Sequence, residues 1–316
     1  MTVTIRHGDC REILRIMPDE SVNCCVTSPP YFWLRDYDVA GQIGHEDTVS
    51  DFVNVLADVF DEVKRVLRPD GVLWLNLGDS YYSGNGQPKG HDPKSSSRNF
   101  SRVKLRPLDV SGWDIPKKSL CGIPWLVALE LQRRQWTLRS DVIWCRETAL
   151  AEPSVTDRPG RQHEYLFLFS KSRRYHFDRA ALREEIVWHI PHQRGGIDGH
   201  SAAFPFALAE QCIISGCPAG GLVLDPFGGS GTTGLAAQHL GRDCILIELN
   251  SDYAAMAETR IQKELGMFAK VSADYPRADA EQLRRHEADA YSATTPNSGF
   301  DSRDGGQLPL TIGDRK

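Results

Sequence analysis

The tetrapeptide Ser28-Pro29-Pro30-Tyr31 places a hydroxyl, two prolines and an aromatic ring directly after an apolar run. An exocyclic amino group on a nucleobase is a poor nucleophile, because its lone pair is delocalised into the ring. Acceptors that hold its N–H hydrogens draw the nitrogen toward tetrahedral geometry, and the Ser28 side chain and Pro29 carbonyl are two candidates. Each proline fixes φ, so the loop is stiff, and Tyr31 offers a face to a base turned out of a duplex. A plain Pro-Pro turn with Tyr31 in the core explains the same residues.

A second motif, LVLDPFGGSGTTG at 222–234, is an apolar run followed by an acid, a glycine turn and a helix start. Its glycines fit G-x-G-x-x-G, a weak signal of a nucleoside cofactor when it stands alone. A P-loop is excluded, since no Lys-Ser/Thr pair follows the last glycine. Glu248 ends the next apolar run, where an acid can accept both hydroxyls of a ribose. A tight strand-to-helix turn and a solvated Glu248 remain the alternative.

Apolar runs alternate with helical patterns along the chain, which predicts an α/β sheet with helices on both faces. Ligands of such sheets bind at the carboxyl ends of strands, where both motifs stand. The predicted strands cover residues 3–5, 21–27, 72–77, 137–145, 164–170, 222–225 and 244–248. The predicted helices cover residues 51–67, 125–135, 205–215 and 232–240.

Three polar segments interrupt or follow this pattern. Residues 81–119 lack a core pattern and are rich in Lys and Arg, so they predict either a DNA-contacting basic loop or a solvated insertion. Its candidate phosphate contacts are Lys94, Arg98, Arg102 and Lys104. Residues 178–199 form a short polar stretch. Residues 266–316 are a polar tail, for which we expect at most one helix near 278–290 and disorder beyond it.

Composition narrows the class of protein. The chain has 316 residues, of which 41% are hydrophobic and 25% charged, as is ordinary for a globular protein. Its net charge of −5 argues against a uniformly basic coat, although local charge can still bind DNA. The chain has no apolar signal core and no membrane-length apolar run, so we expect a cytoplasmic protein. The eight scattered cysteines form no Cys-x-x-Cys pair, which indicates free thiols and no metal site.

TSPPY at 27–31 and DPFGGSGTTG at 225–234, in this order, resemble the amino-methyltransferases of DNA in their permuted, beta-class arrangement. Further blocks look like the same family, among them HGDC at 7–10, LRPDGVLWLNLGDSY at 67–81 and GRDCILIELNSDYAAMAETRI at 241–261. The resemblance implies a Rossmann-like S-adenosylmethionine-dependent fold with a mostly parallel twisted sheet. It implies a catalytic domain over residues 1–265 and a tail over 266–316.

The resemblance also implies roles for single residues. Ser28, Pro29, Pro30 and Tyr31 would hold the target base, Asp9 would lie near the adenine of the cofactor and Phe204 beside its methionine chain. Glu248 would take the ribose hydroxyls. The rest of the implied set for S-adenosylmethionine is Asp225, Pro226, Phe227, Gly228, Gly229, Ser230, Gly231, Thr232 and Asn250.

Ser28 stands where adenine-modifying members more often carry Asp or Asn, which the resemblance associates with cytosine N4. Methylation of adenine N6 is the alternative. The implied partner is double-stranded DNA, read at specific sites, with residues 178–199 as a short candidate recognition region. A cognate restriction endonuclease is compatible with the family, as are a monomer and a homodimer.

Three other functions fit less well. A C5-cytosine methyltransferase needs a cysteine after proline, and here only the reverse order Cys217-Pro218 occurs. A nicotinamide oxidoreductase needs several more strands after the glycine turn than the remaining chain provides. A non-catalytic DNA-binding protein of the same fold would have no need for both motifs to be intact.

Overall fold

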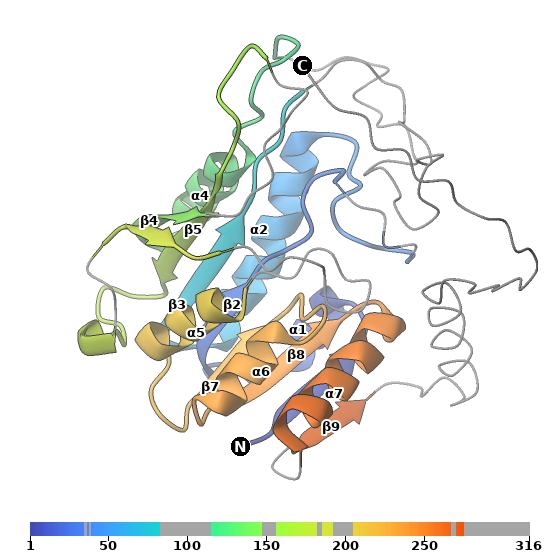
Figure 1. Ribbon diagram of the computed structural model, residues 1–316, viewed down its shortest axis with the longest axis vertical. Coiled ribbons are helices and arrows are strands. Elements are labelled where there is room, and N and C mark those ends of the chain that lie inside the picture. Colours follow the sequence, from blue (N-terminus) through green and yellow to red (C-terminus); the bar gives the residue numbers. More distant parts are fainter. Residues whose placement is uncertain are drawn as a thin grey trace, which may run out of the picture. The chain divides into compact units, whose positions relative to one another are not determined.

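The computed structural model describes residues 1–34, 37, 39–82, 115–146, 156–181, 185–191, 205–266 and 270–274. Within these ranges the strands form one nine-stranded sheet in the order β6-β4-β5-β3-β2-β7-β8-β1-β9 (Figure 1). The strands are β1 (Val3–His7), β2 (Val22–Thr27), β3 (Leu67–Leu77), β4 (Thr137–Cys145), β5 (His163–Ser170), β6 (Val187–His189), β7 (Leu222–Asp225), β8 (Asp243–Glu248) and β9 (Val271–Asp274).

The sheet is mostly parallel. Among the described strands only β5 runs against its neighbours, pairing antiparallel with β3 and with β4, whereas every other neighbouring pair is parallel. The predicted fold class, a Rossmann-like α/β sheet of mostly parallel strands, is therefore confirmed.

Helices cover both faces of the sheet. One face carries α1 (Cys10–Ile16), α2 (Val49–Val66) and α4 (Ile123–Arg133), which contact one another and pack on β8, β3 and β4. The other face, nearer the viewer in Figure 1, carries α5 (Phe206–Gly216), α6 (Thr232–His239) and α7 (Ser251–Leu265). A 3-10 turn, η1 (Arg179–Ala181), lies against α5. Each face has its own hydrophobic cluster, so both faces of the sheet are buried.

The helix predicted at 51–67 shows how the local sequence sets an element. Thr48 caps α2 by accepting a hydrogen bond from the Asp51 backbone N–H at 3.0 Å. Its apolar positions are buried, among them Phe52, Leu56 and Phe60. The helix ends at Val66, and β3 begins at once, because Leu67 has extended backbone and pairs with Val22. The strand prediction of 72–77 therefore started too late, since Pro69 and Gly71 lie within β3.

Three short elements were missed. The seven-residue helix α1 follows HGDC, where the sequence showed only a motif. The strand β6 lies within the polar stretch 178–199, and β9 lies within the tail. The sheet therefore continues to Asp274, past the predicted boundary at 265, because Val3 to Arg6 of β1 pair with β9. Both strands are short sheet edges, where polar residues are common and apolar periodicity is weak.

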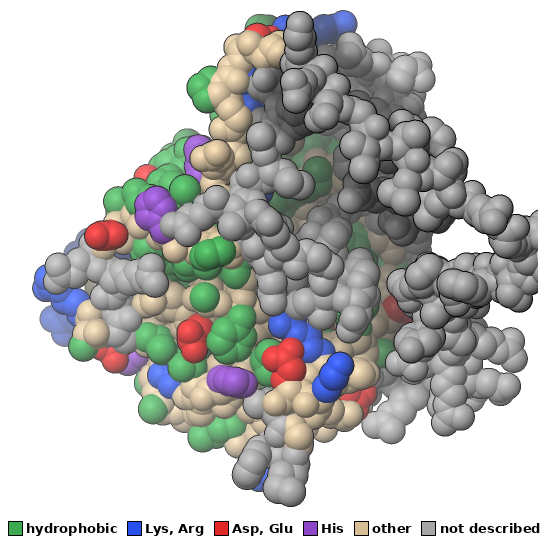
Figure 2. All heavy atoms as spheres, in the orientation of Figure 1, with side chains coloured by type: hydrophobic (Ala, Val, Ile, Leu, Met, Phe, Trp, Pro, Cys, Tyr) green, Lys and Arg blue, Asp and Glu red, His purple; other side chains and the backbone are tan. Residues whose placement is uncertain are grey.

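Three predictions lie outside the described residues. They are the role of Phe204, the helix expected near 278–290, and the phosphate contacts Lys94, Arg98, Arg102 and Lys104. On the described surface that Figure 2 shows, Lys and Arg side chains alternate with Asp and Glu over the face with α5, α6 and α7. This face therefore carries no broad field of one sign, in keeping with the expectation from net charge.

Candidate active site

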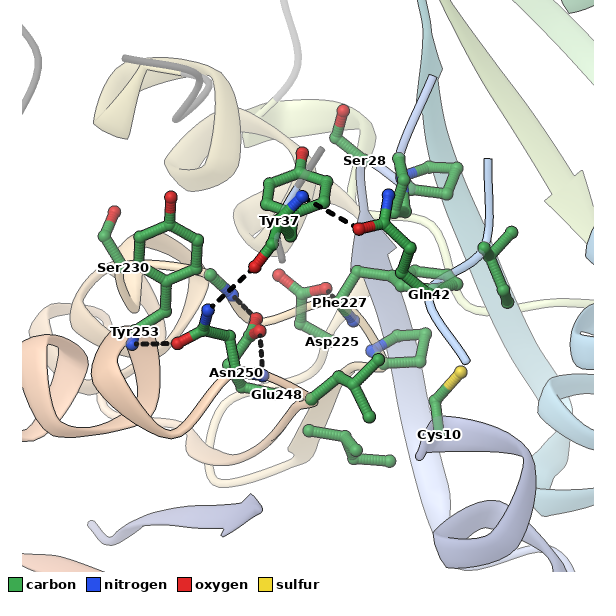
Figure 3. A pocket seen from close by; sticks show the side chains of 18 of the residues that line it. Cys10, Ser28, Tyr37, Gln42, Asp225, Phe227, Ser230, Glu248, Asn250 and Tyr253 are labelled. Carbon is green, nitrogen blue, oxygen red and sulfur yellow. Dashed lines mark hydrogen bonds between the residues drawn. The ribbon is translucent and has the colours of Figure 1, made fainter. Parts of the chain in front are cut away.

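The carboxyl ends of four adjacent parallel strands, β2, β7, β8 and β1, meet at one edge of the sheet. They lead to Ser28, Asp225, Glu248 and Asp9, in that order. A cavity of about 260 Å³ lies at this edge and is lined by all four residues (Figure 3). The fold thus brings together motifs that are almost 200 residues apart in sequence, as expected for a site at the carboxyl ends of strands.

The glycine turn needs its glycines for packing. A Cβ on Gly228 would lie 2.9 Å from the Cβ of Leu246 on β8. Gly231 has a φ of +80°, and a Cβ there would lie 2.9 Å from the Cβ of Ala257 on α7. Gly231 does not line the cavity, whereas Gly228 and Gly229 do. Gly231 is therefore explained by the tight strand-to-helix turn. Gly228 and Gly229 can in addition let the backbone approach a ligand closely.

Glu248 is held rigidly at the end of β8. Its Oε2 accepts a hydrogen bond from the Gly229 backbone N–H at 2.7 Å, and its Oε1 accepts one from the Asn250 N–H at 2.8 Å. Burial raises the pKa of this carboxyl to about 7, and the two N–H donors act against that rise. Each carboxylate oxygen can accept a second hydrogen bond, so both remain able to take hydroxyl groups. Glu248 is therefore no solvated strand end.

A second wall of the cavity is built around Asn250. Its Oδ1 caps α7 by accepting hydrogen bonds from the N–H groups of Asp252 and Tyr253. Its Nδ2 donates to the Tyr37 carbonyl at 3.3 Å, and the Tyr37 N–H donates to Gln42 Oε1 at 2.8 Å. The Tyr37 and Tyr253 rings meet edge to face at 6.1 Å (Figure 3). Tyr37, Gln42 and Tyr253 were missed, since no motif contains the first two and the block at 241–261 gave Tyr253 no role of its own.

Asp9 lies at the N-terminus of α1 and lines the same cavity. Its Oδ1 accepts hydrogen bonds from the Arg11 backbone N–H at 2.8 Å and from Arg11 Nε at 2.9 Å. Burial acts to raise the pKa of Asp9, but the hydrogen bonds and charge of Arg11 outweigh it and hold that pKa below its usual value. Arg11 also donates to the Gly41 carbonyl, which ties the chain near Gln42 to α1.

Asp225 joins the two motifs physically. It is buried, and Oδ1 accepts hydrogen bonds from Thr27 Oγ1 at 2.7 Å and from the Phe227 N–H at 3.0 Å. Its Oδ2 accepts one from Thr233 Oγ1 at 2.7 Å. Burial raises the pKa of Asp225, while these hydrogen bonds oppose the rise. One carboxyl group therefore fixes the loop after β2 against the glycine turn and α6.

A polar cluster lies on the β2–β3–β5 side of the cavity. Ser28 Oγ donates to Asn76 Oδ1 at 3.1 Å, and the Tyr31 hydroxyl donates to Glu164 Oε2 at 2.6 Å. Asn76 Nδ2 also donates to Glu164 Oε2, at 3.3 Å, and Arg146 Nη1 donates to Glu164 Oε1 at 3.1 Å. All five side chains line the cavity. Burial, and then the Glu164 charge, raise the pKa of Tyr31 well above its usual value.

Asn76, Arg146 and Glu164 were not predicted. They come from or directly follow strands that the sequence marked only as core. Asn76 is a buried amide within the apolar run VLWLNL, and that interruption was the available signal for it. Glu164 stands at the polar start of its strand and Arg146 follows its strand, so neither carried such a signal.

Tyr31 fits both interpretations that the sequence left open, a residue packed in the core and a ring that faces a ligand. Its ring packs so closely that a Cβ on Gly78 would lie 2.4 Å from Tyr31 Cε2, and its hydroxyl is hydrogen-bonded inside the protein. Tyr31 nevertheless lines the cavity. The position of the ring is thus fixed before any base arrives.

Comparison with known proteins shows which family has these motifs. A family model described as DNA methylase, of the N6/N4 type, matches residues 22–259, most of the chain. The chain belongs to this DNA methylase family. The methylase therefore acts on exocyclic amino groups of DNA bases, and the alternative of a nicotinamide oxidoreductase is excluded.

Two curated relatives cover most of the methylase. It is 44% identical to the Type II methyltransferase M.SmaI of Serratia marcescens over 266 residues, which are 80% of this chain and 89% of the relative. It is 42% identical to the Type II methyltransferase M.Cfr9I of Citrobacter freundii over 271 residues, which are 83% of this chain and 88% of the relative.

Solved structures agree with the fold. Protein TTHA0409 of Thermus thermophilus, complexed with S-adenosyl-L-methionine, is 26% identical to the methylase, with a TM-score of 0.57 over 86% of this chain and 99% of that one. The cytosine-N4-specific PvuII DNA methyltransferase shares the fold at 20% identity, with a TM-score of 0.63 over 91% of this chain and 93% of that one.

Nothing in the described part of the methylase offers a cysteine nucleophile at the cavity. Of its eight free cysteines, Cys10 lines the cavity, and burial raises the pKa of its thiol to about 12 (Figure 3). A thiol that stays protonated is a poor nucleophile. The described residues also contain no His, Cys, Asp and Glu group able to hold a metal. None of their helices is long and apolar enough to cross a membrane.

The cavity of the methylase fits S-adenosylmethionine by the chemistry of its lining. Glu248 offers carboxylate oxygens suited to ribose hydroxyls. The Ser230 hydroxyl, on a residue only 2% exposed, has no hydrogen-bond partner within the described chain and lines the cavity, so it suits a polar group of a ligand. The cavity also brings together Asp9, Ser28, Pro29, Pro30, Tyr31, Asp225, Pro226, Phe227, Gly228, Gly229, Thr232 and Asn250 as expected.

Proposed function

We propose that this methylase transfers a methyl group to N4 of cytosine at specific sites in double-stranded DNA, as the modification enzyme of a restriction–modification system. The single observation that carries the proposal is the position of Ser28, a neutral acceptor in the same cavity as Glu248, on a loop that Thr27 and Asp225 tie to the glycine turn. The family resemblance associates serine at this position with cytosine. The Type II methyltransferases that the chain resembles support the restriction–modification setting.

The cofactor is S-adenosylmethionine, which supplies a methyl group on a positively charged sulfur. Glu248 would accept hydrogen bonds from the ribose hydroxyls, and Asp9 would lie near the adenine. Ser230 and the Gly228–Gly229 backbone would hold the methionine part.

The target amino group is prepared by the loop after β2. Ser28 Oγ and the Pro29 carbonyl accept its two N–H hydrogens, which localises the lone pair on nitrogen and aims it at the methyl group. The fixed ring of Tyr31 contacts the flipped base. No covalent bond to the protein forms, because the lining offers acceptors and rings, and the Cys10 thiol stays protonated.

Mass spectrometry of nucleosides tests this proposal. Unmethylated bacterial DNA is incubated with the purified full chain and with S-adenosylmethionine carrying an isotopically labelled methyl group, then digested. We expect the label in N4-methylcytosine. Label in N6-methyladenine would replace the cytosine assignment but keep amino methylation, and label at C5 of cytosine would contradict the mechanism as well.

A further inference from the structure

We propose that Glu164 is a positioning residue that forces the Ser28 hydroxyl to act as a hydrogen-bond acceptor toward the target amino group. The inference rests on the proposed role of Ser28 as the group that touches the base. Glu164 does not contact the base itself. Glu164 acts through Asn76 and Tyr31, the two residues beside Ser28. Both donate a hydrogen bond to Glu164 Oε2.

The orientation of the Asn76 amide follows from its surroundings. Its Nδ2 lies 3.3 Å from Glu164 Oε2 and 3.2 Å from the Tyr165 carbonyl oxygen, and both of these oxygens accept. A flipped amide would place an oxygen against two acceptors, and Asn76 is only 2% exposed, so water cannot compensate. Asn76 Oδ1 must therefore face Ser28 Oγ, 3.1 Å away.

The direction of the Tyr31 hydrogen bond is fixed in the same way. A phenol has one proton, and that of Tyr31 is directed to the charged Glu164 Oε2 at 2.6 Å rather than to Asn76 Oδ1 at 3.3 Å. The phenolic oxygen is then an acceptor toward its other neighbours. Ser28 Oγ donates to Asn76 Oδ1 at 3.1 Å, so Asn76 presents an acceptor to it.

A serine hydroxyl can either donate or accept, and only accepting helps this reaction. If Ser28 donated its proton to the amino nitrogen, it would occupy the lone pair that attacks the methyl group. Because Ser28 donates its proton to Asn76 Oδ1, the lone pairs of its oxygen stay available to accept from the target amino group. Arg146 balances the charge of Glu164 through a 3.1 Å contact with Oε1. A neutral serine thus becomes an acceptor through a partly buried carboxylate two hydrogen bonds away.

The test compares Glu164→Gln, Ser28→Ala and the double variant of the full chain. The amide introduced by Glu164→Gln has one acceptor oxygen, which cannot serve Arg146 on one side and Asn76 with Tyr31 on the other, so one side of the cluster meets an N–H donor instead of an acceptor. We expect Glu164→Gln to lower kcat by about tenfold to a hundredfold, the scale of losing one preorganised hydrogen bond at a transition state. Affinity for S-adenosylmethionine should stay within about twofold, because the hydrogen bonds of Glu164 join it to Tyr31, Asn76 and Arg146 rather than to the glycine turn.

The double variant separates positioning from general damage. If Glu164 acts through Ser28, Glu164→Gln should cause no further loss of kcat in the Ser28→Ala background. An equal fold-loss in both backgrounds, or no loss in the parent chain, would overturn the proposal. Glu130→Gln is the matched control, since Glu130 is a carboxylate paired with Arg133 and Arg134 on α4, away from the cavity. It should leave kcat unchanged.

Should Glu164→Gln fail to fold, Asn76→Leu gives a second test, because it removes the acceptor that Ser28 Oγ donates to. It should lower kcat by about tenfold or more in the parent chain and cause no further loss in the Ser28→Ala background. An equal fold-loss in both backgrounds would overturn the proposal. These comparisons use total methyl transfer, so label found in adenine would overturn the cytosine assignment alone.

Discussion

At the scale of single residues, Glu248 makes cofactor binding dependent on pH. Its pKa is raised to about 7 by burial, and ribose hydroxyls donate best to the ionised form. Cofactor binding therefore favours loss of the Glu248 proton, and affinity should rise as the pH increases through about 7. In Glu248→Gln this rise should vanish. Titration calorimetry across roughly two pH units centred on that pKa measures it, and a parallel rise in the variant would assign the effect to another group.

The residues of the site also show how much of it the sequence could predict. Ser28, Asp225 and Glu248 were found because each stands in a motif at a strand end. Asn76 and Glu164 were missed because their function depends on a pairing between β3 and β5, where Asn76 lies opposite Leu166. Strand pairing is a long-range property, and the sequence of a single chain does not reveal which two strands become neighbours in the sheet.

At the scale of elements, Asp225 holds the end of β2 against α6. Asp225→Ala would leave the hydroxyls of Thr27 and Thr233 and the Phe227 N–H without their acceptor inside the protein. We expect a loss of about 2–4 kcal/mol in the free energy of unfolding, measured with urea. The exposed Asp252→Ala should change it by less than about 1 kcal/mol. A small loss at Asp225 would mean that its partners find other acceptors.

The glycine turn allows a matched comparison of two glycines. Gly231 and Gly220 have similar φ values, +80° and +71°, but only at Gly231 would a Cβ meet other atoms, 2.9 Å from Ala257 Cβ. Gly220→Ala should cost about 1 kcal/mol of stability from backbone strain. Gly231→Ala should cost roughly 1–3 kcal/mol more, from overpacking against α7. Equal losses, measured in the same unfolding experiment, would contradict the close packing of the turn.

The elements themselves show what local pattern can predict. The periodic helix α2 and the apolar strands β2, β4 and β7 were placed within about two residues, because burial imposes a period on their sequences. The edges β6 and β9 were missed, because a short strand with one neighbour needs little apolar sequence. The predicted start of β3 was too late, since Pro69-Asp70-Gly71 resembles a turn, but Pro69 and Asp70 are exposed residues near the beginning of the strand and Gly71 is buried within it.

At the scale of the whole molecule, the net charge of −5 requires DNA contacts to be local. We propose that the basic segment 81–119 supplies them. Replacing Lys94, Arg98, Arg102 and Lys104 with Ala should weaken DNA binding and flatten its dependence on salt, by a slope of roughly 0.9 per lost phosphate contact. Cofactor affinity should not change. An unaltered salt slope in binding titrations would leave the segment as a solvated insertion.

The whole methylase combines two tasks in one cavity, and a crossed pair of variants separates them most directly. Ser28→Ala should lower kcat by about tenfold or more while cofactor affinity stays within about twofold, because its hydrogen bond acts at the transition state. Glu248→Ala should weaken cofactor binding by about tenfold or more, because it removes charge-assisted hydrogen bonds. Its kcat at saturating cofactor should fall far less. Single-turnover methyl transfer and calorimetry on both variants give these four values. If Ser28→Ala turned over at the parent rate, or lost cofactor affinity as Glu248→Ala does, Ser28 would not be the group that prepares the amino nitrogen.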